Sequence, residues 1–188
     1  FRLALSGRRG PVHVSLPSNL LAARMDASAA IWPATVPIAR ATLGDADCNK
    51  ILALLAAAEN PIIFAGPQLS DAAGRALLAE LETATGTPAI VLESPRGLAD
   101  ATLGALRDVA KQADLVVLLG KALDFTIKWL AAPEFDPAVR VIAVDPDSDL
   151  VARALREKAA ALALATVADP ALAAQKLAAA AKQMRPRD

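Results

Sequence analysis

The chain has 188 residues, of which 55% are hydrophobic and 21% are charged. This size fits one α/β domain with an attached arm. Twenty basic residues balance twenty acidic ones, so no long-range field favours nucleic acid or an anionic membrane. The apolar runs are shorter than a membrane span requires. We therefore expect a soluble protein that binds neither a membrane nor nucleic acid.

The chain has one cysteine, Cys48, and one histidine, His13. Cys48 cannot form a disulfide within the chain, and no secretion signal precedes it, so the sequence predicts a cytoplasmic location. One cysteine and one histidine cannot supply the usual nitrogen and sulfur ligands of a metal ion. No metal site is expected, and His13 is interpreted as a strand residue.

The first 47 residues differ from the rest of the chain. Residues 11–16 alternate apolar with polar or small side chains, as a strand with one buried face does. Residues 19–47 contain scattered prolines and show no sustained period, which is typical of a linker. The sequence predicts that residues 1–18 close a preceding domain, 19–47 form a linker and 48–188 form a compact domain.

Within the compact domain, segments with helical periodicity alternate with short runs rich in Ile, Val and Leu. The runs do not alternate with polar residues, so they indicate strands buried on both faces, and the helices between them supply parallel crossovers. The predicted fold is α/β, a Rossmann-like, doubly wound parallel sheet of five to six strands with helices on both faces. The expected strands are 62–65, 89–92, 115–119, 141–144 and 162–165, and the expected helices are 49–58, 71–85, 103–113, 150–161 and 170–183.

Ligands of open parallel sheets lie outside the carboxyl ends of the strands. Gly66 follows the first expected strand, Gly120 and Lys121 follow the third, and Asp145 follows the fourth. The glycines would permit close backbone approach, Lys121 would meet a phosphate, and Asp145 would accept hydrogen bonds from ribose hydroxyls. In the alternative, the glycines are turn residues and residues 145–147 cap the next helix.

No catalytic residue is assigned from the sequence. The first loop, residues 66–70, lacks GxGxxG, and Pro67 removes a backbone donor from it. Ser94 has no histidine base later in the chain and no surrounding GxSxG. Charges at the strand ends are interpreted as solvated caps rather than as acid–base pairs; they are Glu93, Arg96, Asp100 and Asp124.

Three segments carry recognisable motifs. Residues 7–17, GRRGPVHVSLP, resemble GRPGPV…(D)(I/V/L)P; residues 113–126, ADLVVLLGKALDFT, resemble ADLVLxLGxRLDFT; and residues 141–147, VIAVDPD, match VIxIDxD. Together, and in this order, they resemble thiamine-diphosphate-dependent enzymes of the acetolactate synthase, oxalyl-CoA decarboxylase and 2-hydroxyacyl-CoA lyase group. The first motif closes the pyrimidine-binding domain of that family, and the other two belong to its central domain.

The resemblance implies the middle one of three α/β domains, together with the last strand of the preceding pyrimidine-binding domain. The parent enzyme would be a decarboxylase or carboligase acting on a 2-keto acid or an acyl-CoA, with the cofactor as electron sink. Thiamine diphosphate and magnesium would bind outside this chain, because the catalytic glutamate would precede Phe1 and the GDG…N motif would follow Asp188. The chain alone is expected to be inactive. Its expected partners are the missing pyrimidine- and diphosphate-binding domains, in a homo-oligomeric parent.

In such relatives the central domain holds FAD, ADP, the ADP part of coenzyme A, or nothing. Ala122 stands where LGxRLD has arginine, and Pro67 stands where many FAD-binding relatives have a further glycine. Residues 93–97 also lack the longer glycine-rich excursion of relatives. The shortened segment implies a changed substrate entry. Ala122 and Pro67 weaken the case for a bound flavin, so ADP or coenzyme A is expected to bind weakly and FAD more weakly still. The nucleotide contacts that the resemblance implies are Arg8, Gly66, Gly120, Asp145 and Asp169.

Two alternatives remain at the level of sequence. In one, the chain is a free-standing adenine-nucleotide or FAD-binding module, like those of transhydrogenases or electron-transfer flavoproteins. In the other, the pocket binds nothing and the domain only spaces its neighbours. Nucleotide affinity separates these alternatives.

Overall fold

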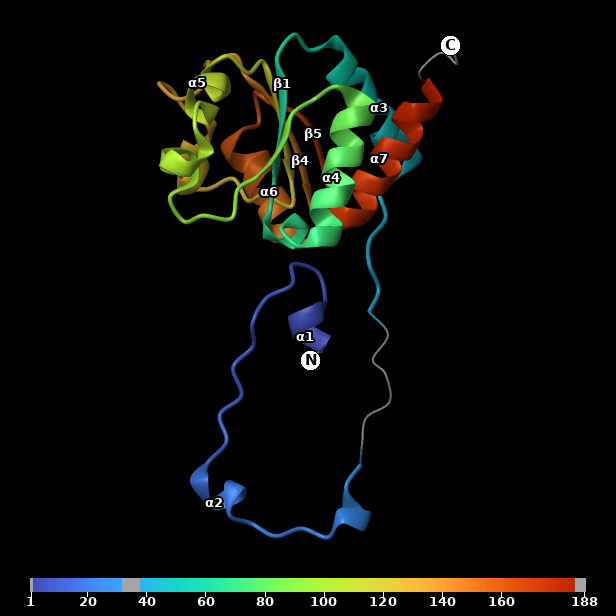
Figure 1. The fold of residues 1–188 in the computed structure, drawn as a ribbon, viewed down its shortest axis with the longest axis vertical. Helices are drawn as coiled ribbons and strands as arrows, with labels where there is room; N and C mark the ends of the chain where they lie inside the picture. The colour runs from blue at the N-terminus through green and yellow to red at the C-terminus, as the bar shows by residue number, and fades with distance from the viewer. Residues whose placement is uncertain (1, 32–37, 185–188) are drawn as a thin grey trace.

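The computed structural model of the protein describes residues 2–31 and 38–184. Its centre is a sheet of five parallel strands (Figure 1). The strand order is β2-β1-β3-β4-β5, so the direction of winding reverses between β1 and β3. The expected doubly wound α/β fold is confirmed. The strands are β1 Pro61–Ala65, β2 Ala89–Val91, β3 Leu115–Leu119, β4 Arg140–Asp145 and β5 Leu162–Val167.

The inner strands are buried on both faces, which explains why their sequences do not alternate with polar residues. In β1, Ile63 and Ala65 belong to one hydrophobic cluster, whereas Ile62 and Phe64 belong to a second cluster on the opposite face. All five residues of β3 are buried. Burial on both faces also fixes the register, because a shift by one residue would exchange the two sets of side chains.

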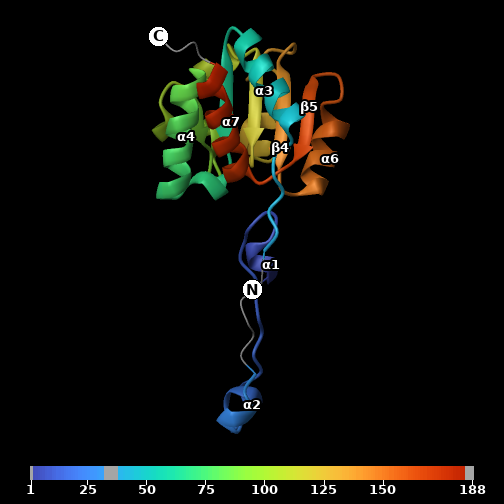
Figure 2. The ribbon, with the colours of Figure 1, turned by 90° about the vertical axis from the view of Figure 1, so that its right-hand side faces the viewer.

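Helices cover both faces of the sheet (Figure 2). One cluster packs the sheet against α3 (Asp45–Ala57), α4 (Ala72–Thr85) and α7 (Pro170–Met184). On the other face lie α5 (Leu106–Lys111) and the loops around it, and α6 (Ser148–Glu157) packs on β4 and β5. The buried face of α7 is rich in alanine, which lets this helix approach the sheet closely; it includes Ala173, Ala174, Ala178 and Ala181.

Several helix boundaries differ from those expected. α3 begins at Asp45, four residues early, because Gly44 adopts an extended N-cap conformation and two aspartates in the first turn favour a helix N-terminus. The helix expected over 103–113 is shorter, because Gly104 takes a backbone conformation that no helix contains. The N-cap of α4 is Asp71, whose side chain accepts from Gly74 N. Gly86 ends α4 in the left-handed conformation.

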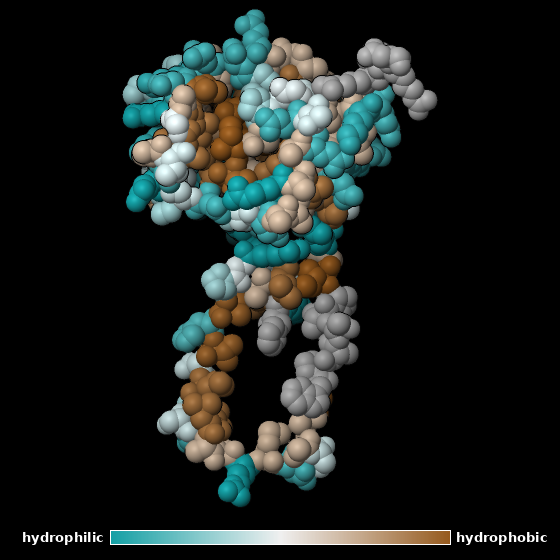
Figure 3. All heavy atoms as spheres, in the orientation of Figure 1, coloured by the Kyte–Doolittle hydropathy of each residue, from teal (hydrophilic) through white to brown (hydrophobic). Residues whose placement is uncertain are grey.

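The described residues before α3 form an arm, which contains the short helices α1 (Arg2–Leu5) and α2 (Ser18–Leu21) (Figure 1). Residues 11–16 of the arm are extended and pair with no strand of the sheet. Their apolar side chains are exposed, Val14 to 70% and Leu16 to 60%, and Figure 3 shows apolar residues along this limb of the arm. Among the described helices, none has the length and apolarity needed to cross a membrane.

Candidate functional site

The carboxyl ends of the strands meet at the lower edge of the sheet in Figure 1. Gly66 follows β1 and Gly120 follows β3, on either side of the point where the winding reverses. The ladder continues through both glycines: Gly66 N donates to Leu119 O at 2.9 Å, and Gly120 N donates to Val144 O at 2.7 Å. Ligands of such sheets usually bind here.

Gly66 and Gly120 pack directly against each other. A Cβ atom at Gly66 would lie 1.7 Å from Gly120 O, and a Cβ atom at Gly120 would lie 2.9 Å from Pro170 Cγ at the start of α7. Gly120 also has φ 65°, which favours glycine. The small size of both residues is therefore needed for contacts within the protein.

Asp145, at the end of β4, receives an arginine from the arm. Arg8 Nη1 donates to Asp145 Oδ2 at 2.8 Å and to Gly120 O at 3.3 Å. The other carboxylate oxygen accepts from Asp147 N at 3.0 Å. Burial raises the pKa of Asp145, and the hydrogen bond from Asp147 and the charge of Arg8 only partly offset this rise. Both carboxylate oxygens of Asp145, which were expected to accept from ribose hydroxyls, thus already accept hydrogen bonds within the protein.

Asp169 receives a second arginine of the arm in a bidentate pair. Arg40 Nε donates to Asp169 Oδ2 at 2.7 Å, and Arg40 Nη2 donates to Oδ1 at 2.5 Å. The same Oδ1 caps α7 by accepting from Ala171 N and Leu172 N. Although burial opposes it, the hydrogen bonds from Arg40 and Leu172 lower the pKa of Asp169. No motif marks Arg40 in the sequence, and it was not predicted.

Lys121 lies at the same edge but points to a residue of its own loop. Its ammonium group donates to both carboxylate oxygens of Asp124, at 2.9 and 3.0 Å. Only 5% of the lysine side chain is exposed, and this burial lowers the pKa of Lys121. Burial alone would raise the pKa of Asp124, but hydrogen bonds from Thr126 and Lys121 lower it. The lysine expected to meet a phosphate is thus held by an internal carboxylate.

Three helices begin at this edge, and each carries its own aspartate cap. Asp71 accepts from Gly74 N at the start of α4, Asp147 accepts from Asp149 N at the start of α6, and Asp169 caps α7. Free N–H groups at a helix N-terminus attract phosphate. Here, side-chain carboxylates already occupy the positions that phosphate oxygens would take.

A cavity of about 250 Å³ remains open between the starts of α4 and α7. Its lining includes Arg9, Arg40, Gln68, Asp71 and Asp169. Gln68 Nε2 donates to Gly7 O at 3.1 Å. Gln68 Oε1 is buried and accepts no hydrogen bond from the residues that the structure describes. The cavity therefore offers a guanidinium group from Arg9, whereas Gln68 Oε1 is buried beneath its surface.

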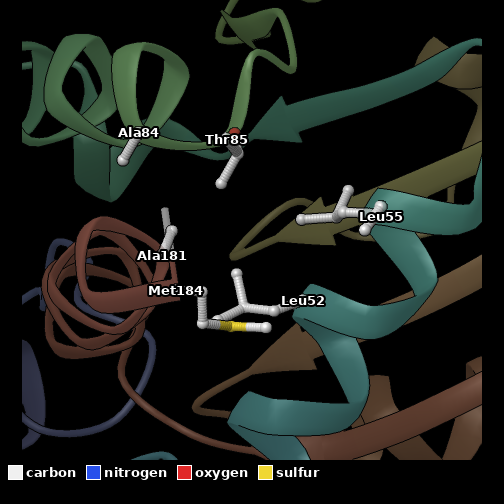
Figure 4. Close-up of a pocket in the computed structure, with 7 residues that line it drawn as sticks. Leu52, Leu55, Ala84, Thr85, Ala181 and Met184 are labelled. Atoms are coloured by element: carbon white, nitrogen blue, oxygen red, sulfur yellow. The ribbon is translucent and has the colours of Figure 1, made fainter. Parts of the chain in front are cut away.

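A second cavity, of about 280 Å³, lies among α3, α4 and α7 near their other ends (Figure 4). Leucine, alanine and methionine side chains dominate its lining, which includes Leu52, Leu55, Ala84, Ala181 and Met184. The hydroxyl of Thr85 is its side-chain polar group, and it donates to Leu81 O within α4 at 2.8 Å. Among residues 2–31 and 38–184, no further polar side chain lines this cavity to orient a nucleotide.

The charges considered for acid–base chemistry have structural partners or lie in solvent. Glu93 pairs with Arg75 at the exposed surface, and Arg96 is exposed. A hydrogen bond from Ser94 and further bonds from Thr102 lower the pKa of Asp100 to about 2. Within residues 2–31 and 38–184, no cluster of His, Cys, Asp and Glu has the arrangement of a metal site.

The histidine and the cysteine of the chain both lie outside this site. His13 is exposed on the arm. Cys48 is buried in α3, and burial raises the pKa of its thiol, which disfavours the nucleophilic thiolate.

The sequence is similar to known proteins over most of its length. Residues 48–177 match the family described as "Thiamine pyrophosphate enzyme, central domain". The 2-hydroxyacyl-CoA lyase 1 of Dictyostelium discoideum is 32% identical over 158 residues, which cover 78% of this chain and 27% of that protein. The oxalyl-CoA decarboxylase of Escherichia coli (strain K12) is 28% identical over 153 residues, covering 71% and 26%. The chain thus spans about a quarter of the length of these relatives.

Among solved structures, a thiamine diphosphate-dependent 4-hydroxybenzoylformate decarboxylase of Rhodococcus jostii RHA1 has a similar fold. The TM-score is 0.62 at 20% sequence identity, and the match covers 99% of this chain and 36% of that chain. At this level of identity the likeness is one of fold.

Proposed function

Because this chain belongs to the family of thiamine pyrophosphate enzyme central domains, we propose that it is the central domain of a thiamine-diphosphate-dependent lyase. A 2-hydroxyacyl-CoA lyase and an oxalyl-CoA decarboxylase are among its relatives, which supports an acyl-CoA as the substrate of the whole enzyme; a 2-keto acid is the alternative substrate. The proposed partners are the pyrimidine- and diphosphate-binding domains, in a homo-oligomeric cytoplasmic enzyme.

The residues that the structure describes do not fit thiamine diphosphate with magnesium. Mg²⁺ is usually bound through one or two carboxylates together with phosphate oxygens, and the two buried carboxylates at the sheet edge, Asp145 and Asp169, are paired with Arg8 and Arg40. We therefore assign no catalytic step to this chain. Its proposed role is architectural, and the observation that supports it is the internally paired network at the carboxyl edge.

This architectural role predicts that the chain neither binds thiamine diphosphate nor decarboxylates 2-keto acids. Calorimetric titration with thiamine diphosphate and Mg²⁺ should give no saturable heat. As a positive control, the same titration into a whole enzyme of the family should show binding. Micromolar affinity for the isolated chain would contradict the proposal.

A second candidate function is weak anchoring of an adenine nucleotide, ADP or coenzyme A, at the carboxyl edge. The cavity beside α4 and α7 favours it, because Arg9 offers a cation on its lining. A phosphate group of the ligand would pair with this guanidinium group. FAD is the less favoured ligand, because Ala122 and Pro67 depart from the family pattern.

Nucleotide anchoring predicts a thermal shift with ADP or coenzyme A at about millimolar concentration, and a smaller one with FAD. Asp145→Asn removes the charge that holds Arg8, so it should weaken ADP binding about tenfold, as expected for one charge-assisted contact. Glu80→Gln, on the exposed surface of α4, is the control and should leave the shift unchanged. If no nucleotide shifts the wild type at this concentration, the architectural role stands alone.

A further inference from the structure

The cations around the open cavity come from the arm. Arg8, Arg9 and Arg40 all precede α3, whereas the body contributes the aspartates of the helix caps. Two cations of the body near this edge, Lys121 and Arg75, are paired with Asp124 and Glu93. Without the arm, the described part of the edge would present mainly carboxylates, and carboxylates repel an anion.

Both limbs of the arm are fixed where they meet the body. The first limb is held by the bonds from Arg8 to Asp145 and from Gln68 to Gly7 O. The second limb is held by the bidentate Arg40–Asp169 pair, together with a bond from Asp169 N to Ala41 O at 2.8 Å. These pairs are partly buried, so salt screens them less than it screens surface pairs.

We propose that docking of the arm completes the anion-binding cavity, so that arm docking and nucleotide binding are linked. Arg9 meets the phosphate, and Arg8 and Arg40 are positioning residues that hold the arm in place. This inference rests on the proposed adenine-nucleotide site and specifies how that site is regulated. Linkage is reciprocal, so a nucleotide that needs the docked arm must also stabilise docking.

The amide of Asp169 reports on docking, because the structure gives it Ala41 O on the second limb as its acceptor. We would measure its hydrogen exchange by NMR in the 188-residue chain while titrating ADP. In the wild type, ADP should slow this exchange. Arg40→Met should speed exchange without ADP and weaken ADP binding about tenfold, because only the docked fraction binds. Arg40→Lys, which keeps the charge, should restore part of the amide protection and part of the ADP affinity.

Arg9→Met distinguishes direct contact with the ligand from positioning of the arm. It should weaken ADP binding about tenfold and leave the exchange of the Asp169 amide without ADP unchanged. Arg24→Met is the matched control, since Arg24 is an exposed arginine elsewhere on the arm, and it should change neither quantity. Pyrophosphate and adenosine, titrated separately, show which half of the ligand Arg9 recognises. Protected amides of β3 in the same spectra verify that each variant is folded.

The outcomes distinguish the two proposals. If ADP binds but speeds exchange at Asp169, or if Arg40→Met leaves the affinity unchanged, the linkage is wrong and the nucleotide site stands. If neither ADP nor pyrophosphate binds the wild type at millimolar concentration, the nucleotide site is wrong and the linkage falls with it.

Discussion

Gly66→Ala is expected to destabilise the protein by about 3 kcal/mol or more, the upper range for overpacking a close-packed site. The added Cβ atom would lie 1.7 Å from Gly120 O, so the ends of β1 and β3 would have to separate. The backbone of Gly66, with φ −83°, suits any residue, and the loss would therefore be purely steric. Urea unfolding followed by circular dichroism gives the change in the free energy of unfolding.

Gly86→Ala is the control for this measurement. Gly86 has φ 71° but open space around a Cβ atom, so alanine should cost only the left-handed backbone strain of about 1–2 kcal/mol. If Gly66→Ala is no more destabilising than Gly86→Ala, the glycine junction at the sheet edge is not as close as described.

Asp124→Ala should cost about 3 kcal/mol at pH 7, because it leaves the buried Lys121 ammonium without its partner. Its effect should also depend on pH. Burial already lowers the pKa of Lys121 below its ordinary 10.5, and the loss of Asp124 should lower it further. The folded variant then binds fewer protons than the unfolded one between the lowered pKa and 10.5. Its stability should therefore rise with pH through this window.

Urea unfolding at pH 7 and at pH 9.5 tests this prediction. The double variant Lys121→Met/Asp124→Ala should recover part of the loss, because no buried charge remains. Glu80→Ala breaks an exposed pair with Lys182 and should cost no more than about 1 kcal/mol. Two results would contradict the assignment of Lys121 as a buried, paired charge. One is that Asp124→Ala loses no more stability than Glu80→Ala. The other is that the stability of Asp124→Ala decreases from pH 7 to pH 9.5.

The fold could be predicted because burial on both faces leaves an uninterrupted apolar run in each inner strand. The family could be predicted from three motifs, and the match over residues 48–177 confirms it. The start of α3 could not, because Asp45 and Asp47 resemble linker residues until a helix N-terminus is placed there. Local patterns therefore identified the elements more surely than their ends.

The sequence predicts where the candidate site lies in the fold, but not which residues pair with one another there. The sequence places Gly66, Gly120 and Asp145 at strand ends, but it does not show that the two glycines pack on each other. Arg40 and Asp169 lie 129 positions apart, and no local pattern links them. The Lys121–Asp124 pair lies within one loop, and that short spacing is a signal that sequence reasoning missed.

β1 lies inside the sheet and precedes both of its neighbours, β2 and β3, in the chain. Pro61 pairs with Leu115 of β3, so this pairing must wait until α4, β2 and α5 have been synthesised. Closing so long a loop makes pairing slow. Until then, β1 can pair only with β2, which has three residues. Ile62, Ile63 and Phe64 therefore stay available to other chains during synthesis, and the rate of translation through β3 should govern how much protein aggregates.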